Sequence, residues 1–453
     1  MGRTPFLLPG VLQALPPVAD VAVLRDGQRF VVGIHPDEVL VARGEAALRA
    51  LDELQRGWWA GLLPYDLGRV VEPWTTRIAD DLGLPDLVLA RFAVRLVIEG
   101  HQAWLEGDGP ARGHLEAALR RARTGQPVAR RIELGQWRSS LSQEEFERSV
   151  RAAQAFITAG DCYQVNLTRR LTCDQPADPI ALFAALVQTN PAPHAALFRL
   201  GDVSVVSASP ERFLRRTGRQ VESRPIKGTG ADATALAESP KDRAENVMIV
   251  DLTRNDLGRI CEYGSVSVSN LCEVEAHPGL YHLVTTVRGT LRPGVRSGAL
   301  IRAAFPPASI TGAPKPRVMQ IIEDLEPCRR GVYCGAVGWI DADQEALDLN
   351  VAIRTFLILD GRTHLGVGAG IIADSVPEHE WWETELKAAR LLAVAGGQEP
   401  LRSGEHAETE WFGSSADHSA ARPPGRGARA GVMGGGARRG RGRLPAGGGG
   451  RWA

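Results

Sequence analysis

Pro225-Ile226-Lys227-Gly228-Thr229 places a lysine in a short turn between proline and glycine. Both residues favour turns, and glycine lets the backbone come close to a small ligand. A lysine amine attacks only after it loses a proton, and partial burial or a cationic neighbour lowers the pKa that controls this step. A Lys-Gly turn on a protein surface is the commoner case, so the neighbouring motifs must decide whether Lys227 is reactive.

The composition is that of a globular protein of 453 residues, with 44% apolar residues, 23% charged residues and no net charge. The sequence contains no apolar run of roughly 18 residues, and the N-terminal residues 1–9 are interrupted by prolines rather than forming a leader. We therefore expect a cytoplasmic protein with no membrane partner. Its cysteines form no Cys-x-x-Cys pair and are expected to be buried, reduced thiols: Cys162, Cys173, Cys261, Cys272, Cys328 and Cys334.

Three regions differ in composition. Residues 1–130 alternate strand-like and helical stretches and show no catalytic constellation, whereas residues 140–396 hold the chemically suggestive motifs. Residues 401–453 carry nine arginines and four acidic residues among many glycines, and we expect this tail to be disordered because it has little apolar surface to bury. Arginines could attract RNA electrostatically, but nothing else in the chain supports nucleic-acid binding, and we expect none.

A helix and a strand open the second region. Ser142-Gln143-Glu144-Glu145 is a capping box, and apolar residues then recur at helical spacing until Gly160. The following segment, Tyr163-Gln164-Val165-Asn166-Leu167, alternates as a strand does, which puts Gln164 and Asn166 on one face.

Two further helices carry paired acids near their starts. Ser239-Pro240 opens one helix and Pro377 opens the other, since proline suits a first helical turn. The acids lie three residues apart in each: Asp242 with Glu245, and Glu380 with Glu383. The helix dipole explains one such pair well. Two pairs that face each other would also offer Mg²⁺ the hard oxygen ligands it prefers.

At these residues the chain resembles the chorismate-utilising enzymes of the anthranilate synthase and aminodeoxychorismate synthase component I family. The resemblance is dense over about residues 140–395 and loose before them. It implies an α+β fold of large, mostly antiparallel sheets packed with helices, with the active site between them. The matching segments occur in the family's order: 163–167, 209–213, 225–229, 245–252, 254–259, 282–284, 311–315 and 368–375.

The resemblance also implies roles for individual residues. Mg²⁺ would be held by Glu245 and Glu383, with Glu380 and Asp242 beside them, and would receive the ring carboxylate of chorismate. The implied substrate-binding residues are Gln164, Gly228, Thr229, Thr311, Tyr333, Arg354, Gly368 and Gly370. An arginine suits a planar carboxylate because its fork donates two hydrogen bonds.

The implied catalytic residues are Lys227, Glu211 and His282. Glu211 would protonate the departing ring hydroxyl, which requires burial or nearby carboxylates to raise its pKa. His282 is open to two interpretations, a packed structural histidine or a residue beside the reacting ring.

Lys227 selects a branch of the family. Anthranilate synthases resemble this chain but have alanine here, whereas lysine resembles the aminodeoxychorismate synthases, in which it attacks the ring and is displaced by ammonia. Gln164 agrees, because the branches that hydrate the ring carry a lysine at that position. The implied product is 4-amino-4-deoxychorismate, the precursor of 4-aminobenzoate and of folate.

Ammonia would come from a partner. No cysteine lies in a Gly-x-Cys-x-Gly turn, so a separate glutamine amidotransferase subunit is expected, as in the family. Two other interpretations stay open at this point. The chain could be an anthranilate synthase component I, or it could be an inactive partner that only binds chorismate or an amidotransferase.

Overall fold

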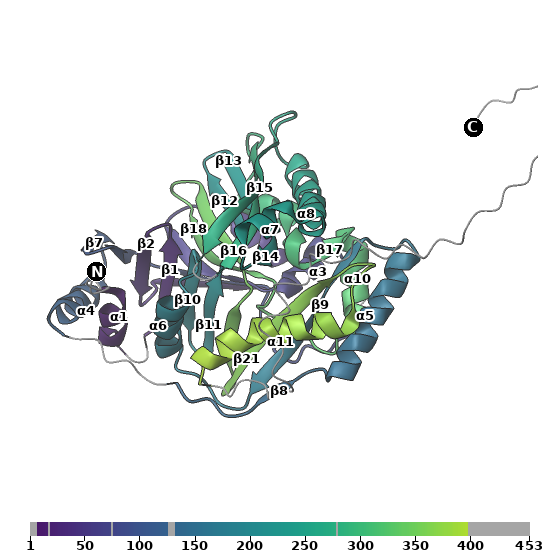
Figure 1. The fold of residues 1–453 in the computed structure, drawn as a ribbon. Helices are drawn as coiled ribbons and strands as arrows, with labels where there is room; N and C mark the ends of the chain where they lie inside the picture. The colour runs from purple at the N-terminus through teal and green to yellow at the C-terminus, as the bar shows by residue number, and fades with distance from the viewer. Residues whose placement is uncertain (1–6, 17–18, 74–75, 126–131, 278–279, 397–453) are drawn as a thin grey trace, which may run out of the picture. The chain divides into compact units, whose positions relative to one another are not determined.

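A computed structural model describes residues 7–16, 19–73, 76–125, 132–277 and 280–396. These residues form two large antiparallel sheets with helices packed on them (Figure 1). The α+β class expected from the sequence is confirmed. The glycine- and arginine-rich tail lies outside the described residues, so its expected disorder stays a prediction.

The first sheet joins strands from both ends of the described chain. Its strands are β1 (Val21–Asp26), β2 (Arg29–Ile34), β6 (Val94–Glu99), β7 (Gln102–Gly107), β8 (Trp137–Ser139), β9 (Gln164–Cys173), β10 (His194–Leu200), β11 (Val203–Ser209), β17 (Gly312–Ala313), β20 (Thr355–Leu359) and β21 (Arg362–Ile371). They run in the order β17-β9-β21-β20-β11-β10-β1-β2-β6-β7, and β8 pairs with the outer part of β9.

The second sheet is built in the same way. Its strands are β3 (Glu38–Ala42), β4 (Trp58–Leu63), β5 (Leu87–Arg91), β12 (Arg212–Thr217), β13 (Gln220–Arg224), β14 (Ile226–Gly230), β15 (Ser267–His277), β16 (Leu280–Thr290), β18 (Ala336–Asp341) and β19 (Ala346–Val351). Their order is β14-β16-β13-β12-β19-β18-β4-β5-β3, with β15 also paired to β16. Strands from residues 21–107 thus take part in both sheets.

The helices of the described residues are α1 (Leu7–Ala14), α2 (Glu45–Glu53), α3 (Gly68–Val71), α4 (Arg112–Thr124), α5 (Gln143–Thr158), α6 (Pro179–Thr189), α7 (Ala233–Glu238), α8 (Pro240–Gly258), α9 (Ser297–Ala304), α10 (Lys315–Leu325) and α11 (Pro377–Val394), with the 3-10 turns η1 (Tyr65–Leu67) and η2 (Ala308–Ile310). The helices α5, α8 and α11 begin where the sequence predicts. Ser142 and Glu145 form the predicted capping box at α5, and Ser239 accepts a hydrogen bond from the Asp242 amide at α8.

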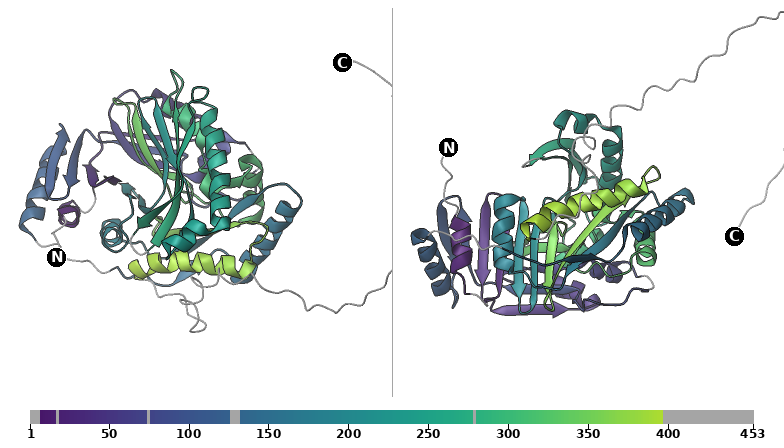
Figure 2. Two further views of the ribbon diagram at one scale, coloured as in Figure 1. Left: turned by 45° about the horizontal axis from the view of Figure 1, so that its top comes forward. Right: turned by 60° about the horizontal axis from the view of Figure 1, so that its bottom comes forward.

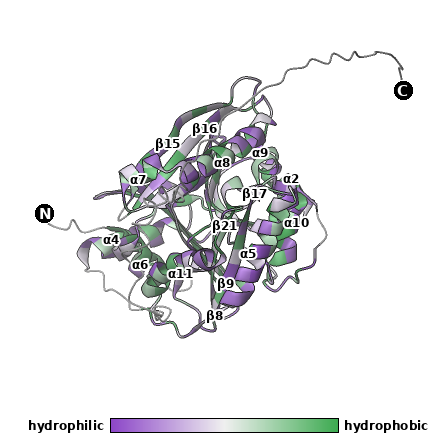
Figure 3. Ribbon diagram, turned by 45° about the vertical axis from the view of Figure 1, so that its right-hand side comes forward, coloured by the Kyte–Doolittle hydropathy of each residue, from purple (hydrophilic) through white to green (hydrophobic). Residues whose placement is uncertain are grey.

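The two sheets pack face to face. Side chains such as Phe198 and Val205 from the first sheet share one apolar cluster with Trp58 and Leu62 from the second. The outer face of each sheet is covered by helices, as two further views show (Figure 2). Colouring by hydropathy shows the resulting amphipathic helices: α5 presents green residues to the sheet and purple residues outward (Figure 3). Each fully buried large apolar side chain in these layers stabilises the fold by about 1.5–3 kcal/mol.

The cysteine and membrane expectations can be compared with the described residues. All six cysteines are free thiols, and Cys328 alone among them is partly exposed. Among the described residues, none of the helices combines the length and the apolar character that a membrane crossing requires.

Candidate functional site

The predicted site residues come from both sheets and two helices. Gln164 lies on β9, Gly368 and Gly370 on β21, Lys227, Gly228 and Thr229 on β14, His282 on β16, Asp242 and Glu245 on α8, and Glu380 and Glu383 on α11. Glu211, Thr311, Tyr333 and Arg354 lie in or beside the connections that end these strands. The ends of β9 and β21 meet α11 and β14, which brings distant parts of the sequence together.

Glycines at alternate positions form one face of β21. A side chain at Gly366, Gly368 or Gly370 would project from the same face, because strand residues alternate between faces. A Cβ at Gly366 would collide with the Tyr333 ring at 2.1 Å, and one at Gly370 would lie 2.4 Å from Gln164 Nε2. Tyr333 and Gln164 therefore fill the space along this face, and only glycine allows that approach.

Lys227 reaches the same glycine face from the other sheet. Its Nζ would lie 3.4 Å from a Cβ at Gly370. The next residue, Gly228, has φ +87°, and a Cβ there would lie 3.0 Å from the Asp242 side chain, so β14 packs closely on α8. Burial lowers the pKa of Lys227, and Glu245 is the strongest opposing charge. The lysine is thus held among charged groups in a position that favours its neutral, nucleophilic form.

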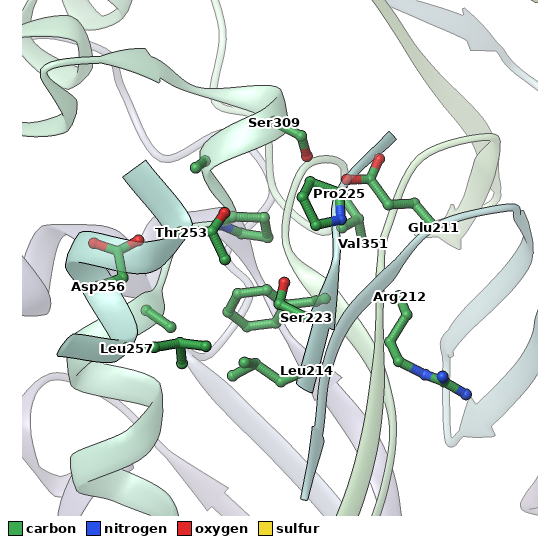
Figure 4. Close-up of a pocket in the computed structure, with 14 residues that line it drawn as sticks. Glu211, Arg212, Leu214, Ser223, Pro225, Thr253, Asp256, Leu257, Ser309 and Val351 are labelled. Atoms are coloured by element: carbon green, nitrogen blue, oxygen red, sulfur yellow. The ribbon is translucent and has the colours of Figure 1, made fainter. Parts of the chain in front are cut away.

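Glu211 is a buried acid that is still partly protonated near neutral pH. Its side chain lies at a cavity between β12, β13, η2 and α8, where Ser309 faces it (Figure 4). Burial raises the pKa of Glu211 to about 7, against the opposing effects of the Ser309 hydroxyl, the Ile226 amide and the charges of Lys227 and Arg354. The Ile226 amide donates to Oε1 at 3.4 Å. This acid has the protonation state that a proton donor needs.

Arg354 is a partly buried cation beside Glu211. Within the described residues no hydrogen bond or ion pair from its guanidinium is found, although its own carbonyl accepts from the Ala208 amide. Its φ of +52° is in the left-handed region, which is uncommon for a residue with a side chain and often marks a functional position. Burial lowers its pKa, and Arg390 lowers it further. A carboxylate from a ligand would relieve both effects.

His282 is neutral at physiological pH. It is 2% exposed, and its Nδ1 lies 2.9 Å from Thr229 Oγ1 on the neighbouring strand β14. Its ring also meets the edge of His277 at a centroid distance of 4.8 Å. Burial lowers the pKa of His282 to about 3, with Arg354 acting in the same direction. The residue can therefore act as a hydrogen-bonding imidazole but carries no positive charge.

The four acids of α8 and α11 lie within electrostatic range of one another. Burial raises the pKa of Glu380 to about 7, and the Glu383 charge adds to this. Glu380 Oε2 has no hydrogen-bond partner within the described chain. Burial also raises the pKa of Glu245, partly offset by Lys227. A divalent cation would stabilise the ionised form of both acids, so the donor set suits Mg²⁺.

The acidic side chains do not converge on one point as the ligands of a bound metal ion do. Within the residues that the structure describes, no three acidic, histidine or cysteine side chains are placed to hold an ion together. Glu383 instead accepts a hydrogen bond from Lys387 Nζ at 2.6 Å, and this charge holds the pKa of Glu383 below its usual value despite burial. Lys387 also donates to the Gly368 carbonyl at 2.8 Å. An ion that binds here would compete with Lys387 for the charge of Glu383.

Three further residues belong to this region but were not predicted. Lys387 lies four residues after Glu383, a spacing that often pairs opposite charges on a helix and could have been read from the sequence. Asn166 is 8% exposed, and its Nδ2 is unpartnered among the described groups, as are both polar atoms of the Gln164 amide. Ser309 has the same property, and only the fold brings it to Glu211.

Thr311 has a structural role in its own right. Its hydroxyl donates to the Pro307 carbonyl at 2.8 Å, and its carbonyl accepts from the Asn166 amide at 2.9 Å. Thr311 thus fixes the connection from η2 to β17 beside β9. Any contact with a ligand stays a prediction, as it does for the other substrate-binding residues.

Comparison with known proteins places this geometry in context. The chorismate binding enzyme family matches residues 19–393. Aminodeoxychorismate synthase component 1 from Klebsiella aerogenes is 41% identical over 347 residues, which cover 73% of this chain and 76% of that protein. Anthranilate synthase component 1 from Thermus thermophilus is 40% identical over 355 residues, covering 74% of this chain and 77% of that protein.

Solved structures agree with the fold. The crystal structure of anthranilate synthase component I from Streptococcus pneumoniae superposes with a TM-score of 0.72 at 27% identity, covering 80% of this chain and 92% of that one. The menaquinone-specific isochorismate synthase MenF from Escherichia coli superposes with a TM-score of 0.68, covering 85% of this chain and 91% of that one. At 19% identity, that second likeness concerns the fold alone.

Proposed function

Because the chain belongs to the chorismate binding enzyme family, which matches residues 19–393, we propose that it aminates chorismate with ammonia to 4-amino-4-deoxychorismate. The observation that carries this proposal is Lys227, partly buried beside Gly370 with a lowered pKa. Three relatives named aminodeoxychorismate synthase component 1 are 38–41% identical to this chain, which supports the same assignment. The product is the precursor of 4-aminobenzoate and of folate.

The chemistry needs one neutral amine and one neutral acid. The neutral amine of Lys227 forms a C–N bond with the ring, while the C–O bond to the ring hydroxyl breaks. Glu211 gives its proton to the departing oxygen, which leaves as water. The lysine nitrogen, now carrying an extra proton, returns it to the Glu211 carboxylate, so the acid is restored.

Ammonia completes the exchange. It forms the second C–N bond, Lys227 leaves the ring, and the proton that ammonia loses goes to the lysine nitrogen. The balance is chorismate plus ammonia giving the aminated product plus water. His282 stays neutral throughout, which suits a hydrogen-bonding residue near the ring.

We assign the orientation of the substrate to polar side chains that lack a hydrogen-bond or ion-pair partner within the described residues. Arg354 is assigned to one carboxylate of chorismate, because its guanidinium has no protein anion paired with it in the described chain. The Gln164 amide, unpartnered and 1% exposed, would hydrogen-bond the ring substituents. Tyr333 and the backbone amides at Gly368 and Gly370 line the same face.

Mg²⁺ would be held by Glu245 and Glu383, with Glu380 and Asp242 beside them. When bound, it supplies a positive charge that receives the second carboxylate of chorismate. The acids on α8 and α11 fix where that charge is, and Lys387 competes for Glu383.

The ammonia is assigned to a separate glutamine amidotransferase subunit. The designation of the relatives as component 1 agrees with a second component. Chorismate is the substrate in either branch of the family, so the choice of branch does not alter this requirement.

Product analysis tests the proposal. The purified chain, given chorismate, Mg²⁺ and ammonium, should form 4-amino-4-deoxychorismate, identified by chromatography and mass spectrometry. Formation of anthranilate by the wild-type chain would favour the anthranilate synthase reading instead. Absence of any aminated product with ammonium would favour an inactive partner.

A further inference from the structure

Ser309 carries a buried hydroxyl that acts on the Glu211 carboxyl and lowers its pKa. It lies on the one-turn helix η2, is 7% exposed, and its Oγ meets no partner at hydrogen-bond geometry within the described residues. A buried hydroxyl without a hydrogen-bond partner is unfavourable, so its retention calls for a reason. It belongs to the same cavity wall as Glu211, and Figure 4 shows its oxygen directed to the side of the cavity where that carboxyl lies.

Apart from Glu211, the cavity offers the Ser309 hydroxyl few polar groups to bond. Its volume of about 20 Å³ is enough for a single water molecule. Among the charged groups that line it, Asp256 is bound by Lys315 at 2.7 Å and by Arg259 at 3.0 Å. Arg212 points away and pairs with Asp348 at 3.0 Å.

The charges that act on Glu211 therefore come from elsewhere. Lys227 on β14 and Arg354 before β20 both favour the ionised carboxylate. The Ile226 amide donates to Oε1 from the β14 side. Ser309 approaches from η2, so it is the side-chain hydroxyl that reaches the acid from the cavity.

We propose that Ser309 is a positioning residue for Glu211, donating a hydrogen bond to the carboxylate formed when the acid has given up its proton. The hydroxyl holds the carboxyl in one orientation and stabilises its ionised form, so that the proton is released to the substrate and recovered afterwards. This inference rests on the proposed function for its role in turnover. The pairing of the two residues itself does not depend on it.

The test compares pH profiles of ammonia-dependent amination from about pH 5 to about pH 9. In Ser309→Ala the lost donor no longer favours the ionised acid, so the pKa of Glu211 rises and the limb of kcat/KM near pH 7, which reports this acid, moves up by about half to one pH unit. We expect kcat to fall about tenfold with KM little changed. Ser309→Thr keeps a hydroxyl, so this limb of its kcat/KM profile should lie at the same pH as in wild type.

Two more variants make the result decisive. Ser309→Cys is close in size and a weaker donor, so it should move the limb in the same direction by less, even if the alanine variant folds poorly. Ser223→Ala removes another hydroxyl that lines the cavity, away from Glu211, and should leave the limb in place. A stable Ser309→Ala protein with an unmoved limb would overturn the inference.

A second readout separates this inference from the proposed function. The pH dependence of unfolding stability also reports the pKa of Glu211, whatever the enzyme does to chorismate. In wild type, the fold loses stability as the pH rises through the pKa of Glu211. In Ser309→Ala this loss should extend to higher pH, and the extension should vanish when Glu211→Gln is added. If chorismate is not aminated but this extension is seen, the pairing stands and the proposed function fails.

Discussion

Lys227 Nζ lies over Gly370, where a Cβ would come within 3.4 Å of it. These two residues belong to different sheets, Lys227 to the edge strand β14 and Gly370 to β21. The missing side chain at Gly370 therefore allows Lys227 and the amide of Gln164, which would lie 2.4 Å from that same Cβ, to approach β21 together.

The pH dependence of turnover should show two limbs. Activity should rise as Lys227 loses its proton, and burial moves this limb below the usual lysine range. Activity should fall as Glu211 ionises, with a pKa of about 7 in the free enzyme. Initial rates at low chorismate concentration, plotted as kcat/KM against pH, measure both limbs. A limb near pH 7 that survives in Glu211→Gln would remove Glu211 from the role of proton donor.

The same glutamate should make the fold less stable as the pH rises. Its folded pKa is raised from 4.5 to about 7, so the folded state binds the proton more tightly. That stabilisation is complete below the unfolded pKa and is lost as the pH rises through the folded one. At pH 8, Glu211→Gln should therefore gain up to about 3 kcal/mol over wild type, and at pH 4 it should gain none. Urea unfolding at the two pH values measures the difference.

Metal dependence should respond to the acids of α8 and α11. Glu245→Gln or Glu383→Gln replaces a charged ligand with a neutral amide, so each should need at least about tenfold more Mg²⁺ for half-maximal activity. Glu378→Gln, an exposed acid in the first turn of the same helix, is the matched control and should titrate like wild type. Wild-type metal dependence in both site variants would place the ion elsewhere.

Arg354 should contribute chiefly to chorismate binding. A charged hydrogen-bonded pair is worth about 1.5–3 kcal/mol, so Arg354→Ala should weaken chorismate binding by about 10-fold to 150-fold. Arg354→Lys keeps the charge but loses the forked pair of donors, so its affinity for chorismate should lie between those of wild type and Arg354→Ala. Equilibrium binding of chorismate without ammonia gives the affinities. If the alanine variant binds as wild type does, the substrate carboxylate lies away from Arg354.

The glycine- and arginine-rich tail should be dispensable. A chain shortened to end at Gly397 should keep its melting temperature, bind its amidotransferase partner and turn over chorismate as the full chain does, because residues beyond this point offer little apolar surface. Thermal unfolding and steady-state rates test this. A large loss in either would assign the tail a place on the enzyme.

Local signals in the sequence were sufficient to predict where the helices of the site begin. The capping box at Ser142 and the prolines at 240 and 377 fix where α5, α8 and α11 begin, because capping is decided by residues within one turn. The order of strands was beyond such reasoning. β9 lies between β17 and β21, partners from the far end of the described chain, and their pairing depends on tertiary contacts.

In the site, too, some features could be predicted from the sequence and others depend on tertiary contacts. The turn around Lys227 suggested its chemistry, whereas the role of Glu211 and the grouping of the site residues came from the family resemblance. The pairing of Glu383 with Lys387, and the approach of Ser309 to Glu211, alter what those residues can do. The second of these could not be inferred locally, because η2 and β12 meet only when both sheets are formed.

The most direct measurement is the mass of the enzyme after reaction with chorismate and Mg²⁺ in the absence of ammonia. Attack by Lys227 with loss of the ring hydroxyl should leave a covalent adduct whose added mass equals chorismate less one water, located on residue 227 by peptide mass spectrometry, and ammonium should discharge it as 4-amino-4-deoxychorismate. Lys227→Ala should fold normally and form no adduct. Full amination activity in Lys227→Ala, or an adduct at another residue, would contradict the account.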